Sequence, residues 1–520
     1  MEKTSKVSNP RRLQVTLAFL GYSFIALTWL FCIPPGSNPD EWAHYLRALS
    51  LSHGSVRGDP ADSYSNRSAS AAQESYLRQT ATWVVVPQGH DPRGLGRNAF
   101  HPMVPAVATT DFVPDMTPSK KVVVIGPYQP FYYALPAVAI RGSVNAIAGI
   151  WRGRMASLLM SLLMLGLCFL CLTERSPHAT PWLGLIGAMT PMVTYLMATL
   201  NSSGLEVSAG LGYFAAALLV TGEERPRRGA WVAFSVAGVV LILSRPTGLQ
   251  WVLAQSVCLM LYRGRGALVA RFRESRKPAL KSLCGMGIAA AVALGWNTAY
   301  GARLTWNPRQ LPGALTRALA EQVDWARQCA GVFQYLDTPM STLGYECVGI
   351  SLGAILVSAA LVGNGRDRIA LLGSLLWFAT IPVLLFVFVI EGTGFGMQGR
   401  YILPFLVGLP LLAGDIVVRR TTRPVQIMLT MAVVPVALVA QFDGWWENGR
   451  RSAVGVMGPH NFIPYAQWNP PYGWPVWEIV TKLGCAMVLA SAVLPCLSLL
   501  NERWRSVKPA KSWSSQPQAS

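Results

Sequence analysis

Long apolar runs separated by polar segments recur along the whole chain, and they predict its architecture. The first run covers residues 13–33, about the 20 residues that a helix needs to cross a bilayer. Further apolar runs lie near residues 155–173, 182–200, 205–221, 230–244, 247–262, 281–297, 346–363, 369–390, 401–418, 424–441 and 475–499. The pattern predicts an all-α, polytopic membrane helical bundle of about 12 transmembrane helices.

Basic residues mark alternate loops of this bundle. They gather in segments 3–12, 225–228, 263–281, 366–368, 419–423 and 503–511. Because positive loops stay in the cytoplasm, both termini are predicted to be cytoplasmic. An extra span through residues 128–140 would reverse every later loop, so this segment is predicted to be a juxtamembrane helix lying in the interface.

The same count places three large loops on the outer face, at residues 34–154, 298–345 and 442–474. Large loops over one face of a bundle favour a membrane-embedded enzyme with an outward-facing site. The predicted organisation is a cytoplasmic N-terminus (1–12), a catalytic module (13–418) that includes the first two outer loops, C-terminal helices (419–506) and a disordered tail (507–520).

Composition supports the membrane assignment and removes one class of partner. Of the 520 residues, 52% are hydrophobic and only 13% are charged, as expected for a polytopic membrane protein. The net charge of +19 is explained by positive cytoplasmic loops, so no nucleic acid partner is expected. Nine cysteines show no zinc-binding spacing, and only Cys329 and Cys347 are candidates for a disulfide on the outer side.

Two adjacent carboxylates follow the first predicted span directly, in the segment Asn38-Pro-Asp-Glu-Trp-Ala-His44. A carboxylate at the mouth of a membrane helix, close to headgroups, is a functional candidate. Asp40 is the first choice for a general base and Glu41 is its rival; one of them can instead orient an acceptor or hold a divalent cation. His44 lies four residues from Asp40, so it can tune that carboxylate or donate to sugar hydroxyls. The alternative is a solvated helix cap and a surface histidine.

Two arginines are candidates for binding an anionic group such as a phosphate. Arg400 ends a glycine-rich turn, Glu391-Gly-Thr-Gly-Phe-Gly-Met-Gln-Gly-Arg400, whose backbone amides can also face an anion. Arg245 lies between two apolar runs, where a cation is costly to bury without a role. The alternative for both is a snorkelling side chain that reaches lipid headgroups.

Four motifs resemble those of a family of predicted bacterial polytopic membrane proteins of unassigned function. They are the segment 38–44, Gly126-Pro-Tyr-Gln-Pro-Phe-Tyr-Tyr133, Asn201-Ser-Ser-Gly-Leu-Glu206 and Gln398-Gly-Arg-Tyr401. That family is similar to the GT-C superfamily of polyprenyl-phosphate-sugar-dependent glycosyltransferases. The resemblance implies a GT-C-like bundle in which substrate is bound by further residues of these motifs. These residues are Tyr128, Asn201, Glu206, Gln398 and Tyr401.

Aromatic residues crowd the outer segments, and most fit the interfacial belt of a membrane protein. Trp445 and Trp446 are followed by Glu447 and Arg450 rather than by a new span. They are therefore added to the candidate substrate-binding residues, because tryptophan rings can stack on sugar faces.

The resulting hypothesis is a glycosyltransferase of the bacterial plasma membrane, with its active site on the outer face. It would move a sugar from a polyprenyl-phosphate donor to a cell-envelope glycan or lipid acceptor. No cofactor is certain, and a divalent cation is possible. A transporter or flippase for lipid-linked sugars is the main alternative, with the acidic pair as an ion site, and a scaffold subunit is a third. The sugar, the acceptor and the stereochemical outcome stay open.

Overall fold

The computed structural model describes residues 9–62, 64–66, 68–106, 112–175, 180, 182–222, 226–304 and 308–507. Most of the predicted N-terminal segment and nearly all of the predicted tail lie outside these ranges. Within them, eight helices are long and apolar enough to cross a membrane. They are α1 (Asn9–Cys32), α5 (Ala146–Arg175), α8 (Ser202–Val220), α12 (Arg276–Tyr300), α14 (Thr342–Val362), α15 (Gly365–Leu385), α19 (Arg423–Val454) and α20 (Trp474–Val507).

The other four predicted spans are also helical, but their helices are shorter. Two of them are α9 (Arg228–Ser244) and α10 (Gly248–Arg263), with 17 and 16 residues. An α-helix rises 1.5 Å per residue, so each is at the short limit for crossing the hydrocarbon core. The helical bundle is confirmed, and the count of twelve crossings stays a prediction.

Proline divides the remaining two predicted spans. The first consists of α6 (Leu183–Ala188) and α7 (Pro191–Met197), where Pro191 cannot continue a helix and instead begins one behind the N-cap Thr190. The second consists of α17 (Leu403–Leu406) and α18 (Gly408–Arg420), with Pro404 in the first turn of α17. Broken helices of this kind are tolerated at membrane depth only where neighbouring helices cover them.

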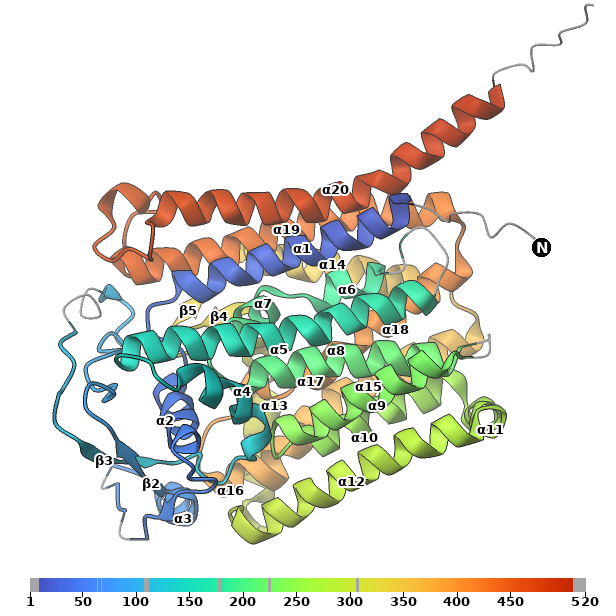
Figure 1. Ribbon diagram of the computed structural model, residues 1–520. Helices are drawn as coiled ribbons and strands as arrows, with labels where there is room; N and C mark the ends of the chain where they lie inside the picture. The colour runs from blue at the N-terminus through green and yellow to red at the C-terminus, as the bar shows by residue number, and fades with distance from the viewer. Residues whose placement is uncertain are drawn as a thin grey trace, which may run out of the picture.

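The axes of the long helices are aligned along one direction of the molecule, and the large loops gather at one end (Figure 1). Helix α8 lies at the centre, in contact with α5, α9 and α7. All of its residues are buried, because its glycine, alanine and serine side chains let neighbouring backbones approach closely. Its first turn therefore holds polar groups in a fixed place beneath the loops.

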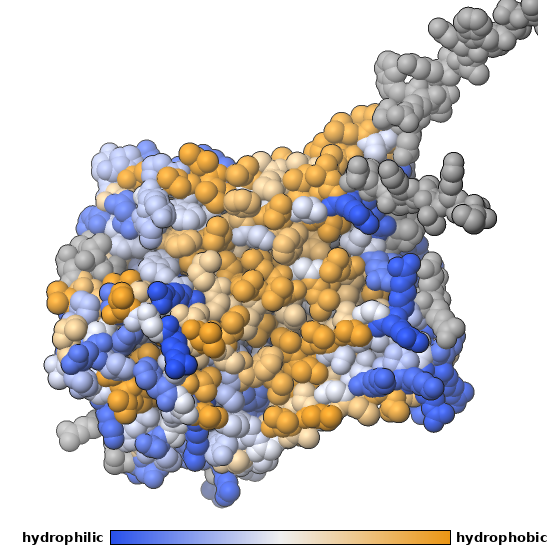
Figure 2. All heavy atoms as spheres, in the orientation of Figure 1, coloured by the Kyte–Doolittle hydropathy of each residue, from blue (hydrophilic) through white to orange (hydrophobic). Residues whose placement is uncertain are grey.

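We call the end with the large loops the loop end, and the opposite end, where α11 (Arg265–Glu274) lies, the basic end. A band of apolar side chains covers the molecule between these two polar ends (Figure 2). This band is the expected lipid-facing surface of a membrane bundle.

The loop end is built from short helices and two small sheets. Its helices are α2 (Glu41–Ser52), α3 (Ala71–Thr80), α4 (Pro130–Ile140), α13 (Leu311–Gly331) and α16 (Glu391–Thr393). Short 3₁₀ helices cover Pro308–Gln310, Gly399–Tyr401 and Ile463–Tyr465, and a π-helix covers Phe386–Ile390. One antiparallel sheet joins β1 (Asp59–Pro60), β2 (Thr82–Val86) and β3 (Ser119–Val123); the other joins β4 (Val332–Phe333) and β5 (Thr338–Pro339).

Two of these helices have the character of juxtamembrane helices. Helix α4 has 11 residues, too few to cross a bilayer. Helix α13 has three faces. Its protein face is buried and carries Ala314, Ala318, Trp325 and Cys329; its polar face carries Arg317, Glu321, Asp324 and Arg327; and its exposed apolar stripe carries Leu311, Leu315, Leu319 and Val323. A helix of this kind is suited to the membrane interface.

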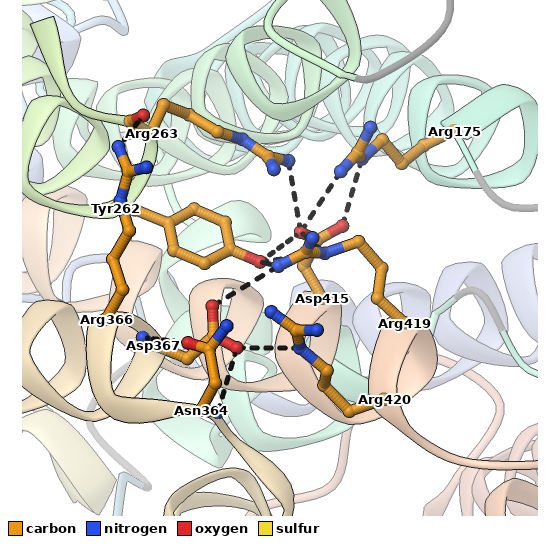
Figure 3. Close-up of polar contacts among 9 residues, drawn as sticks. All are labelled: Arg175, Tyr262, Arg263, Asn364, Arg366, Asp367, Asp415, Arg419 and Arg420. Atoms are coloured by element: carbon orange, nitrogen blue, oxygen red, sulfur yellow. Dashed lines mark hydrogen bonds and ion pairs between the residues drawn. The ribbon is translucent and has the colours of Figure 1, made fainter. Parts of the chain in front are cut away.

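Two carboxylates tie four helices together at the basic end (Figure 3). Asp415 of α18 accepts hydrogen bonds from Arg175 of α5 and from Tyr262 and Arg263 of α10. Arg419 pairs with both Asp415 and Asp367 of α15, and Arg420 bonds to Asp367. The two aspartates are largely buried, so this network fixes the helix ends.

Two sequence-based expectations change. Helix α19 continues to Val454, so the predicted loop 442–474 begins inside a helix; it runs through Asn448 and Gly449 and ends before Gly455, which has φ of +82°. Cys329 and Cys347 are both buried free thiols, and the Cys329 thiol donates to the carbonyl of Gly399 at 3.3 Å. The disulfide prediction is therefore wrong.

Candidate active site at the loop end

Asp40 forms the N-cap of α2 but does not cap it with its side chain. Its backbone is left-handed, with φ of +59°, a conformation that costs a non-glycine residue energy and is enriched at functional sites. The side chain turns away from the helix and accepts a hydrogen bond of 2.6 Å from Nη2 of Arg400. It is 54% exposed, so one face of the carboxylate stays open.

The electrostatic surroundings keep Asp40 ionised and His44 neutral. Partial desolvation would raise the pKa of the Asp40 carboxyl, but Arg400, His44 and Arg245 outweigh it and lower the pKa below its usual value. Burial lowers the pKa of His44 to about 3, and Arg245 and Arg400 act in the same direction against the attraction of Asp40. His44 shares a hydrogen bond of 2.7 Å with the hydroxyl of Tyr133.

Glu41 is shielded from solvent and fully paired, in contrast to Asp40. It is fully buried and forms a two-pronged ion pair with Arg154 of α5, with Nε to Oε1 at 2.7 Å and Nη2 to Oε2 at 2.6 Å. The backbone amide of Gly36 and the side-chain amide of Asn38 also donate to it, both at 2.9 Å. No face of this carboxylate is open, so the geometry favours Asp40 over Glu41 as the reacting group.

Arg400 is a buried cation with spare donors. Its side chain is 5% exposed and lies over the ring of Tyr401 at 5.5 Å. Apart from the bond to Asp40, its Nε and Nη1 atoms are shielded from solvent and have no partner among the described residues. A buried unpaired N–H of a charged group is costly, and such a group is a candidate for binding an anionic ligand.

The glycines before Arg400 pack against protein. A side chain at Gly399 would collide with the carbonyl of Trp325 at 2.5 Å, and one at Gly394 would meet the amide of Gln73 at 2.7 Å. Gly394 also has φ of +70°, which favours glycine. Gly399 and Gly394 therefore let the turn pack against α13 and α3. This differs from the sequence-based expectation, in which the backbone amides of the turn face an anion.

Arg245 lies beside Arg400 and is held from three sides. It follows α9, and its Nη1 donates to Ser203 Oγ at 3.0 Å and to Glu206 Oε2 at 3.3 Å. Its Nη2 donates to the hydroxyl of Tyr128 at 3.3 Å, and the guanidinium lies 5.2 Å from the centre of the Tyr401 ring. Nε has no partner in the described part of the chain.

Glu206 and Asn201 support this arrangement from the first turns of α8. Glu206 is fully buried and accepts from Thr247 Oγ1 at 2.6 Å and from Trp251 Nε1 at 3.0 Å, besides Arg245. Asn201 caps α8 and donates from its side-chain amide to the carbonyl of Pro39 at 3.3 Å. Both residues hold other groups in position, Glu206 the guanidinium and Asn201 the backbone before Asp40.

Most of the predicted site residues converge, and two do not. Asp40, His44, Tyr128, Arg245, Arg400 and Tyr401 form one cluster, with Asn201 and Glu206 beneath it. Gln398 precedes it, and its buried Oε1 has no partner among the described residues. Trp445 and Trp446 instead pack with Phe442, Phe462 and Trp474 in an aromatic core against the start of α20. Their predicted substrate role has no support from this placement.

Sequence reasoning missed Tyr76 of α3, which joins the cluster from a distant loop. Burial raises the pKa of its hydroxyl, and Tyr128, Tyr401 and Asp40 of the cluster add to this shift. Nothing in its local sequence marks it, because α3 is an ordinary capped helix with a Ser70–Gln73 capping box. No group of three or more metal-ligating side chains forms within the described ranges.

Comparison with known proteins gives a family and a distant structural likeness. A protein-family model described as "Predicted membrane protein (DUF2142)" matches residues 23–409, most of the chain. No curated protein matches. Among solved structures, the chain is similar to ArnT from Cupriavidus metallidurans bound to undecaprenyl phosphate, with 16% sequence identity and a TM-score of 0.42; the match covers 94% of this chain and 77% of that chain. We draw no inference about chemistry from so distant a likeness.

Proposed function

The chain belongs to the DUF2142 family of predicted membrane proteins, and we propose that it is a GT-C-like glycosyltransferase that uses a polyprenyl-phosphate sugar. One observation carries this proposal. A half-exposed carboxylate, Asp40, pairs with the buried guanidinium of Arg400, and a second buried guanidinium, Arg245, lies over the same Tyr401 ring as Arg400. Both arginines still have N–H groups without a partner among the described residues. The arrangement supplies a base and an anion site within one cluster.

The reaction needs both parts. A hydroxyl oxygen of the acceptor attacks the anomeric carbon of the donor sugar, and the bond from that carbon to the phosphate oxygen breaks. Asp40 takes the hydroxyl proton, as a general base does. The electron pair leaves with the phosphate, so the products are the extended acceptor and polyprenyl phosphate.

The leaving phosphate is stabilised by cations that are in place before the reaction. Arg400 and Arg245 are held by Tyr401, Glu206 and Ser203, so little reorganisation is needed as charge develops. Guanidinium groups match phosphate oxygens with two parallel hydrogen bonds. Because Arg400 also holds Asp40, the arriving phosphate competes with that carboxylate and frees it to act as a base.

A transporter or flippase for lipid-linked sugars is the second candidate. Such proteins bind their cargo near the bilayer midplane, between repeated halves. Here the charged cluster lies beside the loop helix α2 and the first turn of α8. This position favours chemistry at the membrane surface over passage through the bundle.

The orientation belongs to the same proposal. We place the loop end on the outer face of a bacterial plasma membrane, with both termini in the cytoplasm, because the basic segments gather at the opposite end. Reporter fusions near Asp91 should report the outside, and fusions near Arg271 should report the cytoplasm. A cytoplasmic signal at Asp91 would overturn this placement.

The deciding experiment is turnover by the purified protein in lipid nanodiscs. Polyprenyl phosphate should be released from a polyprenyl-phosphate sugar in the presence of envelope glycan acceptor, and the sugar should appear in that acceptor. Movement of intact donor between leaflets without release would support the transporter instead. The same assay with EDTA decides whether a divalent cation takes part.

A further inference from the structure

A polar cavity of about 530 Å³ opens beside the charged cluster. Its wall is formed by α3, by Arg303, Leu304 and Gln310, by the polar face of α13 and by the segment 386–396. The lining segments belong to the loop end, outside the apolar band; the exception is the start of segment 386–396. A ligand of this cavity therefore comes from the aqueous side.

Tyr76 connects the cavity to the charged cluster. It lines the cavity, and burial, together with Tyr128, Tyr401 and Asp40 of the charged cluster, raises the pKa of its hydroxyl. The opposite wall ends at Gly396, four residues before Arg400. The cavity and the charged cluster therefore meet at Tyr76.

The charges of the cavity balance, unlike those of an anion site. Its charged residues are two arginines and two glutamates, and Arg317 of α13 pairs directly with Glu391 of the turn. Arg303 and Glu321 supply the remaining charges of opposite sign. A phosphate group is therefore expected to bind at Arg400 and Arg245, whereas the cavity suits an uncharged molecule.

The remaining wall has the chemistry that binds sugars. Hydroxyl and amide groups of Ser70, Ser75, Gln79 and Gln310 line it, and the rings of Tyr76 and Phe395 meet edge to face with centres 5.8 Å apart. Sugar rings offer hydroxyls to such amides and C–H faces to such aromatic rings. The cavity volume lies in the range of sites that enclose small ligands.

A π-helix, Phe386–Ile390, leads into this wall, and Phe386 is one of its lining residues. π-helical turns are rare and occur mainly at functional sites. Together these observations lead us to infer that the cavity is the acceptor subsite and binds an uncharged saccharide. This inference rests on the proposed function, because it assigns the second substrate of the same reaction.

Gly396 offers a direct test, because a side chain built there meets nothing within 4 Å and would project into the cavity. Gly396→Phe should fill the cavity without a clash. Gly313→Phe is the matched control, since Gly313 on α13 is equally open but does not line the cavity. Both variants are compared with the parent in nanodiscs.

Two readouts separate the substrates. The first is binding of neutral gluco-oligosaccharides by saturation-transfer NMR, with the same oligosaccharides oxidised to uronic acids as the anionic probe. The second is release of polyprenyl phosphate from the donor with water as the acceptor. Gly396→Phe should weaken neutral saccharide binding at least tenfold and change donor hydrolysis by less than twofold, while Gly313→Phe changes neither.

Other outcomes overturn the inference in distinct ways. Equal loss of donor hydrolysis in Gly396→Phe would assign the cavity to the donor sugar. Preference for the oxidised probe, no saccharide binding by the parent, or binding unaffected by Gly396→Phe would also reject it. Absence of polyprenyl phosphate release by the parent even with envelope glycan acceptor, with saccharide binding intact, would reject the glycosyltransferase and leave the saccharide site standing.

Discussion

Two clusters of arginine and aspartate, one at each end of the molecule, are built differently. At the basic end, Asp415 and Asp367 are largely buried and each accepts from several guanidinium groups (Figure 3). At the loop end, Asp40 is 54% exposed and has one guanidinium partner, Arg400. The basic-end carboxylates are saturated, and the loop-end carboxylate is open.

The N–H groups without a partner are also distributed unequally between the two clusters. Arg400 has two shielded N–H atoms without a partner among the described residues, and neighbouring Arg245 has a third. At the basic end one such atom occurs in the described cluster, Nε of Arg263. Saturated pairs fix helix ends, whereas open pairs can exchange a protein partner for a ligand. Similar residue types therefore serve anchoring in one place and chemistry in the other.

The sharpest way to test this division is to neutralise the open carboxylate. Asp40→Asn should lower turnover by about a hundred- to ten-thousand-fold, the usual loss for a general base. Donor affinity should be kept or increased, because asparagine competes less with phosphate for Arg400. The rate of polyprenyl phosphate release measures turnover, and a direct binding assay measures donor affinity.

Glu41→Gln is the matched control one residue away. It leaves Arg154 buried without a full counter-charge, so it should lower the thermal stability of the protein. Near-normal turnover in Asp40→Asn, together with a stable but inactive Glu41→Gln, would move the base assignment to Glu41. Full activity in both would remove the case for an enzyme.

The converse change breaks the saturated cluster. Asp415→Asn removes the negative charge shared by Arg175, Arg263 and Arg419 and should cost about 3–5 kcal/mol of unfolding free energy, the range for an uncompensated buried charge. Turnover per folded molecule should stay close to that of the parent. Thermal unfolding in detergent and activity normalised to folded protein distinguish these results. Loss of turnover at unchanged stability would give the basic end a direct role in catalysis.

Arg400 should show an intermediate effect on binding. Arg400→Ala should weaken donor binding by about 2–5 kcal/mol, the range for removing one partner of a buried charged contact. Arg400→Lys should recover only part of this loss, because lysine keeps the charge but lacks the planar fork. Donor titration by microscale thermophoresis gives both values. Unchanged donor affinity in Arg400→Ala would transfer the phosphate role to Arg245.

The sequence predicted the bundle well, because membrane-length apolar runs and basic loops are strong local signals. It also predicted Asp40, Arg245 and Arg400 as parts of a site, since charged residues next to apolar runs are rare. It could not distinguish Asp40 from Glu41. That distinction depends on Arg154, which lies 113 positions from Glu41 in the chain and inside an apolar helix.

Other failures have the same physical origin. Tyr76 joins the site through the packing of α3, and its neighbours in sequence carry no signal of this. Trp445 and Trp446 follow an apolar run, which predicts a loop, but α19 continues past them. Trp445 is buried and Trp446 is partly buried in an aromatic core. Residues whose role depends on a distant partner are the ones that a local pattern misses.

The smallest expected effect is on pH dependence, and it tests the Asp40–Arg400 pair most directly. Arg400 and Arg245 lower the pKa of Asp40 below its usual value of 3.8, so the base is ionised at every pH above that value. The acid limb of kcat/KM, which reports groups of the free enzyme, should therefore lie below pH 3.8. His44, with a pKa of about 3, should add no limb near 6.5.

Arg400→Gln should move this limb to higher pH, because the leading attraction is lost while partial desolvation of Asp40 remains. The stability change should be small, since an ion pair with one half-exposed partner contributes about 0–1 kcal/mol. That contribution is present above the usual pKa of the carboxyl and is lost as the pH falls through the lowered one. The pH profile of kcat/KM on a short-chain donor, recorded for parent and variant, measures the shift. An acid limb at the same pH in the variant would mean that Arg400 does not set the pKa of Asp40. The Asp40–Arg400 pair would then be an ordinary surface ion pair.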